Sequence, residues 1–290
     1  MNNLISRRHA PWAVAIAAAA LGGCARQQAS TPAEVVDTTA RSAVQVVRDV
    51  QEIQNLMSRR AFYHSAGRND LEFALYANRP DISWGQNQGY RVGPASIKAD
   101  YVTDNIRNRD AEWARLSKIY PQLKNDPSKS GVGIFVMHTL STPVIEIASD
   151  GQTAKGVWYT PGAIGMVDKK GKLTGDWLWE RYAVDFIKEN GQWRFWHILV
   201  LTDFLTPMGK DLQPAPVASA PVGTEGKSSG TQTSSSGPRP FDIKVQNYSS
   251  WSPTTVQQLE PRLPEPYRTF SETFSYGPPA DAVKAADPAK

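Results

Sequence analysis

The fold is decided by three runs of sequence, GIFVMHTL (133–140), TPVIEIASDGQTAKGVWYTPG (142–162) and DWLWERYAVDFIKENGQWRFWHILVLTDF (176–204). Val, Ile, Phe, Trp and Tyr dominate them, and these side chains suit the pleated, half-buried surface of a β-strand. Asp150-Gly151 and Asn190-Gly191 are strong hairpin signals, because both central residues of the favoured two-residue turn need positive φ. The three runs therefore predict an antiparallel sheet.

The third run alternates regularly, so its two faces can be read from the sequence. One face carries Trp177, Trp179, Arg181, Ala183 and Asp185, and the other carries Leu178, Glu180, Tyr182, Val184 and Phe186. Aromatic side chains occur on both faces. This distribution suits a strongly curved sheet that is packed on its inside and partly covered on its outside.

A single polar residue, His138, interrupts the apolar face of the first run. By alternation it shares that face with Ile134, Val136 and Leu140, so its imidazole should point where they point. If this face is concave, the imidazole stands in an apolar cavity and is a candidate acid or base. The alternative is a core histidine that is hydrogen-bonded to a backbone carbonyl.

Length and charge narrow the class of protein. The chain has 290 residues, 40% of them hydrophobic, which allows one sizeable domain plus non-globular segments. Its formal net charge is +4 without a basic stripe, so we expect no nucleic-acid partner. Four histidines and one cysteine show no metal-ligand spacing, and we expect neither a metal site nor a cofactor.

Residues 1–23 have the pattern of a bacterial export signal. Arg7 and Arg8 are followed by an apolar run, residues 12–21, that is too short to span a bilayer. It leads to Cys24, the only cysteine, in the context Leu-Gly-Gly-Cys, which resembles a lipobox. We expect lipidation of Cys24, with palmitate or similar acyl chains, to anchor the protein to a bacterial membrane on the periplasmic or extracellular face of the cell envelope. The alternative is a plain signal peptide with an incidental cysteine.

Composition divides the rest of the chain. After a polar tether (24–41), the periodic segments of one domain fill residues 42–208. Residues 209–240 are rich in Pro, Ala, Ser and Gly, which is typical of a flexible linker. Residues 241–290 form an aromatic, Pro-rich tail that either wraps an exposed surface in extended form or is disordered.

Helical patterns precede the sheet. Apolar residues recur at three- and four-residue spacing from about Ser42 and stop near Gly67. A short helix is expected from Asn69, a short strand over 81–84, and a further helix from Pro94 to about residue 119.

This order of elements resembles the SnoaL-like branch of the nuclear transport factor 2-like superfamily. The resemblance covers about residues 42–207 and includes the motifs H…P-V-I-E-I-x-x-D-G-x-T-A-K-G-x-W and W-x-W-x-R-Y-x-x-D-F-x-x-E-N-G-x-W. It implies an α+β cone, in which a curved antiparallel sheet wraps the N-terminal helices around a deep pocket. An extended Pro-rich C-terminal tail is added here.

Related pockets include those of dehydratases, isomerases and cyclases that act on polycyclic compounds. Carried over to this sequence, the resemblance makes His138 the strand histidine that moves a proton and Tyr63 its oxygen-polarising partner. The aspartate that accompanies them in the dehydratases falls at Gly67 in this chain. The expected substrate-binding residues are Trp84, Trp158 and Tyr182; the alternative for Trp158 is packing, the usual role of a large aromatic side chain.

Two functions remain open from the sequence. The first is an envelope-anchored, cofactor-independent lyase or isomerase that acts on a small aromatic or polycyclic compound. The second is a non-catalytic lipoprotein that binds a small hydrophobic molecule or another protein. Large aromatic residues on the outer face also predict a cover for it, which is either a second copy in a homodimer or the chain's own tail.

Overall fold

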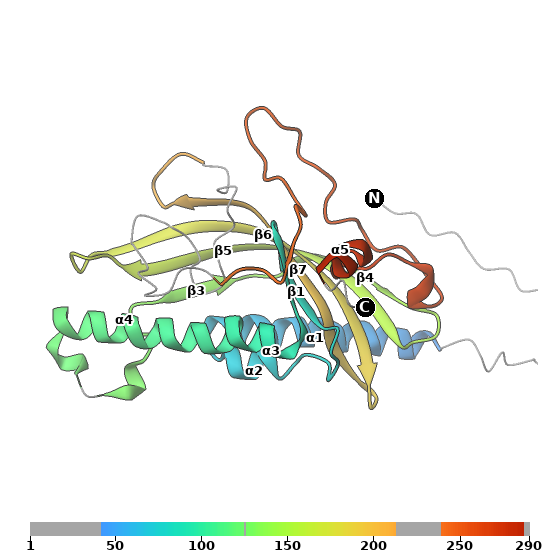
Figure 1. Cartoon of the computed structure of the whole chain (residues 1–290), viewed down its shortest axis with the longest axis horizontal. Helices are drawn as coiled ribbons and strands as arrows, with labels where there is room; N and C mark the ends of the chain where they lie inside the picture. The colour runs from blue at the N-terminus through green and yellow to red at the C-terminus, as the bar shows by residue number, and fades with distance from the viewer. Residues whose placement is uncertain (1–41, 125, 213–238, 287–290) are drawn as a thin grey trace, which may run out of the picture. The chain divides into compact units, whose positions relative to one another are not determined.

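The computed structural model describes residues 42–124, 126–212 and 239–286, all of which belong to one compact unit (Figure 1). The expected export signal, Cys24, the polar tether and most of the expected linker lie outside the described residues. The expectations about them therefore stay predictions.

The helices and strands are, in chain order, α1 (Ala43–Ser65), α2 (Asn69–Phe73), β1 (Ser83–Gln86), β2 (Gly89–Val92), α3 (Gly93–Ile97), η1 (Lys98–Asp104), α4 (Asn105–Ile119), η2 (Pro121–Leu123), η3 (Pro127–Lys129), β3 (Phe135–His138), β4 (Ser141–Ile147), β5 (Thr153–Val167), β6 (Leu173–Glu189), β7 (Gln192–Pro207), β8 (Ile243–Lys244), η4 (Phe270–Glu272) and α5 (Ala280–Ala286). Of the segments labelled η, η1 is a π-helix and the others are single 3₁₀ turns.

The described strands form one sheet of eight strands in the order β3-β5-β6-β7-β1-β2-β8, and β4 pairs with β5 next to β3. Antiparallel pairing joins β5 to β6 and β6 to β7 along nearly their whole lengths, as the sequence predicts. Three pairs were not predicted: β1 and β8 each pair antiparallel with β2, and β1 runs parallel to β7, with Trp84 opposite Ile198. Because separate helices pack on this largely antiparallel sheet, the α+β class is confirmed.

The turn between β6 and β7 matches its sequence signal. Asn190 and Gly191 have φ values of 51° and 75°, so both central residues adopt the positive φ that the turn requires. The turn between β4 and β5 differs, because only Gly151 has positive φ there, at 69°. Asp150 instead accepts the backbone N–H of Gln152 through its side chain, at 2.9 Å, which stabilises a different turn.

Helix α1 begins and ends as its sequence predicts. Ser42 caps it by accepting the backbone N–H of Gln45, and Gly67 follows its end with a φ of 67°. The apolar stripe of α1 lies on the inner face of the sheet, defined as the face that carries Trp158, Tyr182 and Phe186. Three α1 residues belong to this core: Ile53, Leu56 and Met57.

The helix expected from Pro94 is interrupted. It consists of α3, the seven-residue π-helix η1 and α4, and η1 turns Asp100, Tyr101 and Asp104 into buried positions. A π-helical segment carries wider backbone turns than an α-helix, so regular helical spacing does not predict which of its side chains point inward.

From Ile243 on, the described tail packs on the outer face of the sheet, on the side away from the helices (Figure 1), whereas Arg239 pairs with Asp104 of η1 and Phe241 packs against the inner core. β8 adds a short strand beside β2, with Ile243 opposite Tyr90. The cluster beneath the tail combines sheet residues with tail residues: Tyr90, Val157, Ala183, Leu199, Leu201, Ile243, Tyr248 and Tyr276. Part of the outer face is therefore covered by the chain's own tail.

A first ionic anchor holds the tail near its middle. Arg181 makes two parallel 2.9 Å hydrogen bonds to the carboxylate of Asp203, and both side chains are buried. Tyr248 of the tail donates to the same carboxylate at 2.5 Å. Arg181 also donates to the backbone carbonyls of Gln258, at 3.0 Å, and Glu260. One guanidinium thus satisfies both a sheet carboxylate and tail carbonyls.

A second anchor lies under the end of the tail. Lys155 Nζ lies 2.5 Å from the carboxylate of Asp185, and both side chains are completely buried. The carboxylate also accepts from the hydroxyl of Ser275 (2.7 Å) and the backbone N–H of Tyr276 (2.8 Å), and His197 Nδ1 lies 2.9 Å from it. Burial alone would raise the pKa of Asp185, but His197 and Lys155 hold it below its usual value.

Aromatic rings of the tail enclose the ammonium group of Lys155. Its Nζ lies 4.4 Å from the ring centre of Phe270, 4.7 Å from that of Phe274 and 5.1 Å from that of Tyr276. Burial lowers the pKa of Lys155, and Asp185 partly offsets the effect. A cation that has lost its water is stabilised here by a carboxylate and by ring faces.

Candidate functional site

Two histidines face each other in the interior of the domain. His64 lies in the last turn of α1, and His138 is the last residue of β3. Their ring centres are 4.9 Å apart and the ring planes meet at 85°. His138 is only 6% exposed and lies opposite Gly162 of β5, on the inner face of the sheet. The helix end and the strand end therefore bring two groups capable of acid–base chemistry into contact.

A buried network holds His64. Tyr101 donates to Glu72 at 2.5 Å, Arg60 donates to the Tyr101 hydroxyl at 3.0 Å, and Arg60 Nε lies 3.1 Å from Glu72. His64 Nδ1 lies 2.8 Å from the Tyr101 oxygen. Because the single hydroxyl proton of Tyr101 is directed to Glu72, we assign Nδ1 of His64 as the donor in this contact. The network fixes the ring and its tautomer.

Burial sets the charge states of this network. The pKa of Tyr101 is raised far above its usual value, mainly by burial, so the phenol stays neutral. Burial would also raise the pKa of Glu72, but Arg60, His64 and Tyr101 together hold it below its usual value. Glu72 is therefore ionised and paired with the Arg60 guanidinium. Asn69 donates a further 3.2 Å hydrogen bond to this carboxylate.

His138 has its own carboxylate and its own phenol. Its Nδ1 lies 3.3 Å from Glu180 and 3.2 Å from the hydroxyl of Tyr182, two residues that point inward from β6. The other Glu180 oxygen accepts from Thr202 of β7 at 3.2 Å. Arg60 lies over the Tyr182 ring, 4.8 Å from its centre, and so joins the surroundings of both histidines.

The residues expected to bind substrate all lie on this inner face. Trp84, Trp158 and Tyr182 are buried members of the core cluster. The Trp84 ring lies 5.9 Å from that of Tyr101, and Tyr182 contacts His138, so these two border the histidine pair. Trp158 packs edge-on against Phe186, which is a packing contact.

The structure brings His64, one residue after Tyr63, to His138. Successive helical residues point about 100° apart, so the two side chains leave α1 in different directions. Tyr63 is half-buried. Its catalytic role stays a prediction.

The position expected for the aspartate of the related dehydratases is occupied by Gly67, which has no side-chain carboxylate. A β-carbon at this glycine would come within 1.9 Å of the Arg109 guanidinium, and its φ of 67° disfavours other residues. Glu72 and Glu180 provide carboxylates next to the histidines instead. Sequence reasoning missed Arg60, Glu72 and Tyr101 completely. Among the charged partners of the two histidines, only Glu180 could have been found from the sequence, because it is a charged residue on an otherwise apolar strand face.

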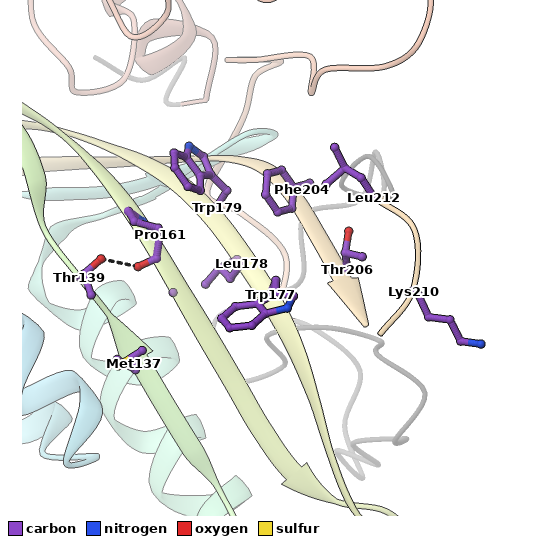
Figure 2. A pocket seen from close by; sticks show the side chains of 11 residues that line it. Met137, Thr139, Pro161, Trp177, Leu178, Trp179, Phe204, Thr206, Lys210 and Leu212 are labelled. Atoms are coloured by element: carbon purple, nitrogen blue, oxygen red, sulfur yellow. Dashed lines mark hydrogen bonds between the residues drawn. The ribbon is translucent and has the colours of Figure 1, made fainter. Parts of the chain in front are cut away.

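A pocket of about 530 Å³ lies on the outer face and not at the histidines (Figure 2). It is lined by Met137, Thr139, Pro161, Gly162, Trp177, Leu178, Trp179, Phe204, Thr206, Lys210 and Leu212. Met137 and Thr139 flank His138 along β3, so their side chains point to the opposite face of the sheet. Strand β3 thus separates this pocket from the histidine pair.

Two further findings concern the described residues alone. Within residues 42–124, 126–212 and 239–286, no cluster of three or more His, Cys, Asp or Glu side chains is arranged to hold a metal ion. Across the same ranges, no helix combines the length and the apolar character needed to cross a membrane.

The family model for the SnoaL-like domain matches residues 45–198, just over half of the chain, and the chain therefore belongs to this family. The matched range contains all but the first two residues of α1, and it contains His64, His138 and their carboxylate partners. The family resemblance inferred from the motifs is confirmed. No curated protein has a significant sequence match to this chain.

Several solved structures are similar to this chain. A putative scytalone dehydratase from Novosphingobium aromaticivorans is 13% identical, with a TM-score of 0.41, and the match covers 61% of this chain and 98% of that one. A hexachlorocyclohexane dehydrochlorinase from Novosphingobium barchaimii is also 13% identical, with a TM-score of 0.41 and coverages of 60% and 100%. A Mycobacterium tuberculosis protein of unknown function is 16% identical, with a TM-score of 0.36 and coverages of 56% and 77%. Because the identities and TM-scores are this low, these structures carry no argument about activity, and we judge activity from the site itself.

Proposed function

We propose that this protein is a cofactor-independent lyase or isomerase that moves a proton on a small aromatic or polycyclic compound. The observation that carries the proposal is the contact between His64 and His138, each of which also contacts a carboxylate and a phenol. Proton transfer next to a carbonyl needs a positioned base, an acid and a donor to the developing oxyanion, and no bound cofactor.

The formal charges of the buried groups support an acid and a base in one site. Arg60 and Glu72 cancel each other, and Glu180 adds one negative charge. The buried cluster is therefore neutral when the two imidazoles and Glu180 together hold one additional proton. An isolated charge is costly to bury, so this state is favoured. One imidazole can then act as an acid while the other acts as a base.

The proposed chemistry follows from that state. In an elimination, the neutral imidazole takes the proton from the carbon next to a carbonyl, the carbon–oxygen bond breaks, and the imidazolium protonates the departing hydroxyl to give water. In an isomerisation the proton returns to a different carbon. His64 and His138 share the roles of base and acid, and Tyr182 is the phenol placed to stabilise the oxyanion.

Two buried polar atoms on the inner face support binding of an oxygenated ligand. Trp84 Nε1 and Thr160 Oγ1 have no hydrogen-bond partner within the described part of the chain. Thr160 lies opposite Glu180 in the strand register, and the Trp84 ring borders Tyr101. Because buried donors and hydroxyls are usually satisfied, they are suited to hydrogen-bond a ligand oxygen.

A non-catalytic binding protein is the alternative, and the outer pocket favours it. That pocket is lined largely by apolar side chains and is separated from His138 by strand β3. A protein whose ligand sits there would need no acid or base. Under this alternative the histidine pair is a polar part of the core.

Turnover of hydroxylated aromatic ketones by variants distinguishes the two functions. His138→Ala should abolish turnover while leaving ligand affinity nearly unchanged, because the imidazole acts mainly in the transition state. His197→Gln is the matched control, since His197 is buried on the opposite face of the same sheet. Absence of turnover by the unmodified protein across the panel, or full activity of His138→Ala, would contradict the enzyme proposal.

We also propose that the protein is held in the cell envelope by lipidated Cys24. The support is the sequence pattern of residues 1–24. Cys24→Ser should move the protein from the membrane fraction to the soluble fraction of a bacterial extract. Unchanged fractionation of this variant would contradict the lipid anchor.

A further inference from the structure

One end of the outer face carries exposed apolar side chains in neighbouring strands. Met137 lies opposite Ala163, which lies opposite Trp177, and the next row places Phe135 opposite Gly165. The exposed members, called here the apolar patch, are Phe135 (53% exposed), Met137, Leu173 (70%), Trp177 (52%), Met208 and Leu212. Exposed apolar side chains that lie together in this way are typical of an interaction surface.

The described part of the tail covers a different region of the outer face. Its side chains pack on Val157, Ala183, Leu199 and Leu201. The apolar patch surrounds the hairpin end of β5 and β6 and the end of β7, beyond these contacts (Figure 1). Figure 2 shows Trp177 and Leu212 on this side, with Lys210 extending away from the sheet.

Exposed lysines border the apolar patch. Lys169, Lys170 and Lys172 occupy the hairpin between β5 and β6, directly before Leu173, and Lys210 follows the end of β7. The nearby Asp168 carboxylate accepts the backbone N–H groups of Lys170 and Lys172, each at 2.8 Å. These four lysines, called here the lysine rim, outnumber the two aspartates that lie among them, Asp168 and Asp211, so the border of the patch is net positive.

We propose that the apolar patch and the lysine rim bind an anionic lipid bilayer surface. Tryptophan and aliphatic side chains favour the boundary between headgroups and acyl chains, and lysines beside them attract anionic headgroups. A second copy fits the surface less well, because a two-fold contact would bring two lysine rims to one interface. The proposal is independent of the proposed reaction and of Cys24.

Binding to vesicles tests the proposal. The described residues from 42 to 286 belong to one compact unit, so a piece that spans residues 39–290 can be used without Cys24. It is mixed with vesicles of phosphatidylcholine alone or with an equal share of phosphatidylglycerol, and the bound fraction is measured by sedimentation. We expect binding only to the anionic vesicles, and quenching of Trp177 by brominated lipid that disappears in Trp177→Phe.

Variants divide the contributions of charge and apolar contact. Alanine at Lys169, Lys170 and Lys172 should weaken binding at least about tenfold, because each lysine near an anionic surface contributes on the order of fivefold. The matched control places alanine at three other exposed lysines, Lys98, Lys244 and Lys284, and should change affinity less than about twofold.

Four results would overturn the proposal. These are absence of binding to anionic vesicles, equal binding to both vesicle types, equal losses in the rim and control variants, and a dimer in light scattering that Trp177→Ala converts to monomer. The last result would assign the apolar patch to a second copy of the chain. Loss of binding in Phe135→Ala/Trp177→Ala with an unchanged melting temperature would support the proposal independently of the lysines.

Discussion

Replacing Lys155 by methionine should destabilise the protein strongly, because its partner Asp185 keeps a buried charge. Both side chains are 0% exposed and their charged atoms are 2.5 Å apart. Breaking a buried ion pair by removing one partner usually costs about 3–5 kcal/mol. Asp185 retains contacts with Ser275, Tyr276 and His197, so we expect the lower end of this range.

A loss of about 3 kcal/mol corresponds to a melting temperature lower by roughly 6–12 °C in a domain of this size. The free energy of unfolding is measured by urea titration of tryptophan fluorescence, and release of the tail by limited proteolysis. We expect the tail to be cleaved before the sheet, because the same substitution removes the cation that Phe270 and Phe274 enclose.

The matched control is Arg68→Met. Arg68 also pairs with a carboxylate, Asp70, at 2.7 Å, but their side chains are 54% and 50% exposed. Exposed pairs are worth about 0–1 kcal/mol, so this change should be nearly silent. The reasoning is refuted if Lys155→Met costs less than about 1 kcal/mol, or no more than the control.

Three further predictions follow from single residues. His64→Gln should lower turnover by a factor on the order of 10²–10⁴, as expected for loss of one member of the acid–base pair, and kcat checks this; a similar loss in Tyr63→Phe would support the catalytic role predicted for Tyr63. Gly67→Ala should cost about 1 kcal/mol or more in urea unfolding, because the native φ is positive, and an unchanged midpoint would contradict it. The pKa of Asp185 is lowered in the folded state, so near pH 4 the unfolded chain binds more protons and stability falls as pH falls. Asp185→Asn should flatten this acid dependence, and an equally steep dependence in that variant would exclude the assignment.

Much of the fold could be predicted from local patterns. Alternation and turn residues are local properties, which is why β6, β7 and their Asn190-Gly191 turn were predicted correctly. The parallel pairing of β1 with β7 could not be predicted, since a four-residue strand has no partner-specific signal. The docking of the tail was left open because its contacts join residues far apart in sequence.

The candidate site was only partly visible for the same reason. His138 was found because a lone polar residue interrupts an apolar strand face. Tyr101 lies in the π-helix η1, where regular helical spacing fails, and Glu72 lies in a five-residue helix too short for a pattern. His64 was not predicted, because neighbouring helical residues such as Tyr63 and His64 point in different directions and the sequence alone does not show which of them points inward.

The acid–base pair of His64 and His138 is tested most directly by nitrogen NMR of histidine-labelled protein. The chain has only four histidines, so glutamine variants can assign each ring. We predict that one imidazole of the pair is protonated at neutral pH and that His138→Gln changes the titration of His64. The proposed acid–base pair would be contradicted if both rings were neutral at neutral pH, or if His138→Gln left the titration of His64 unchanged.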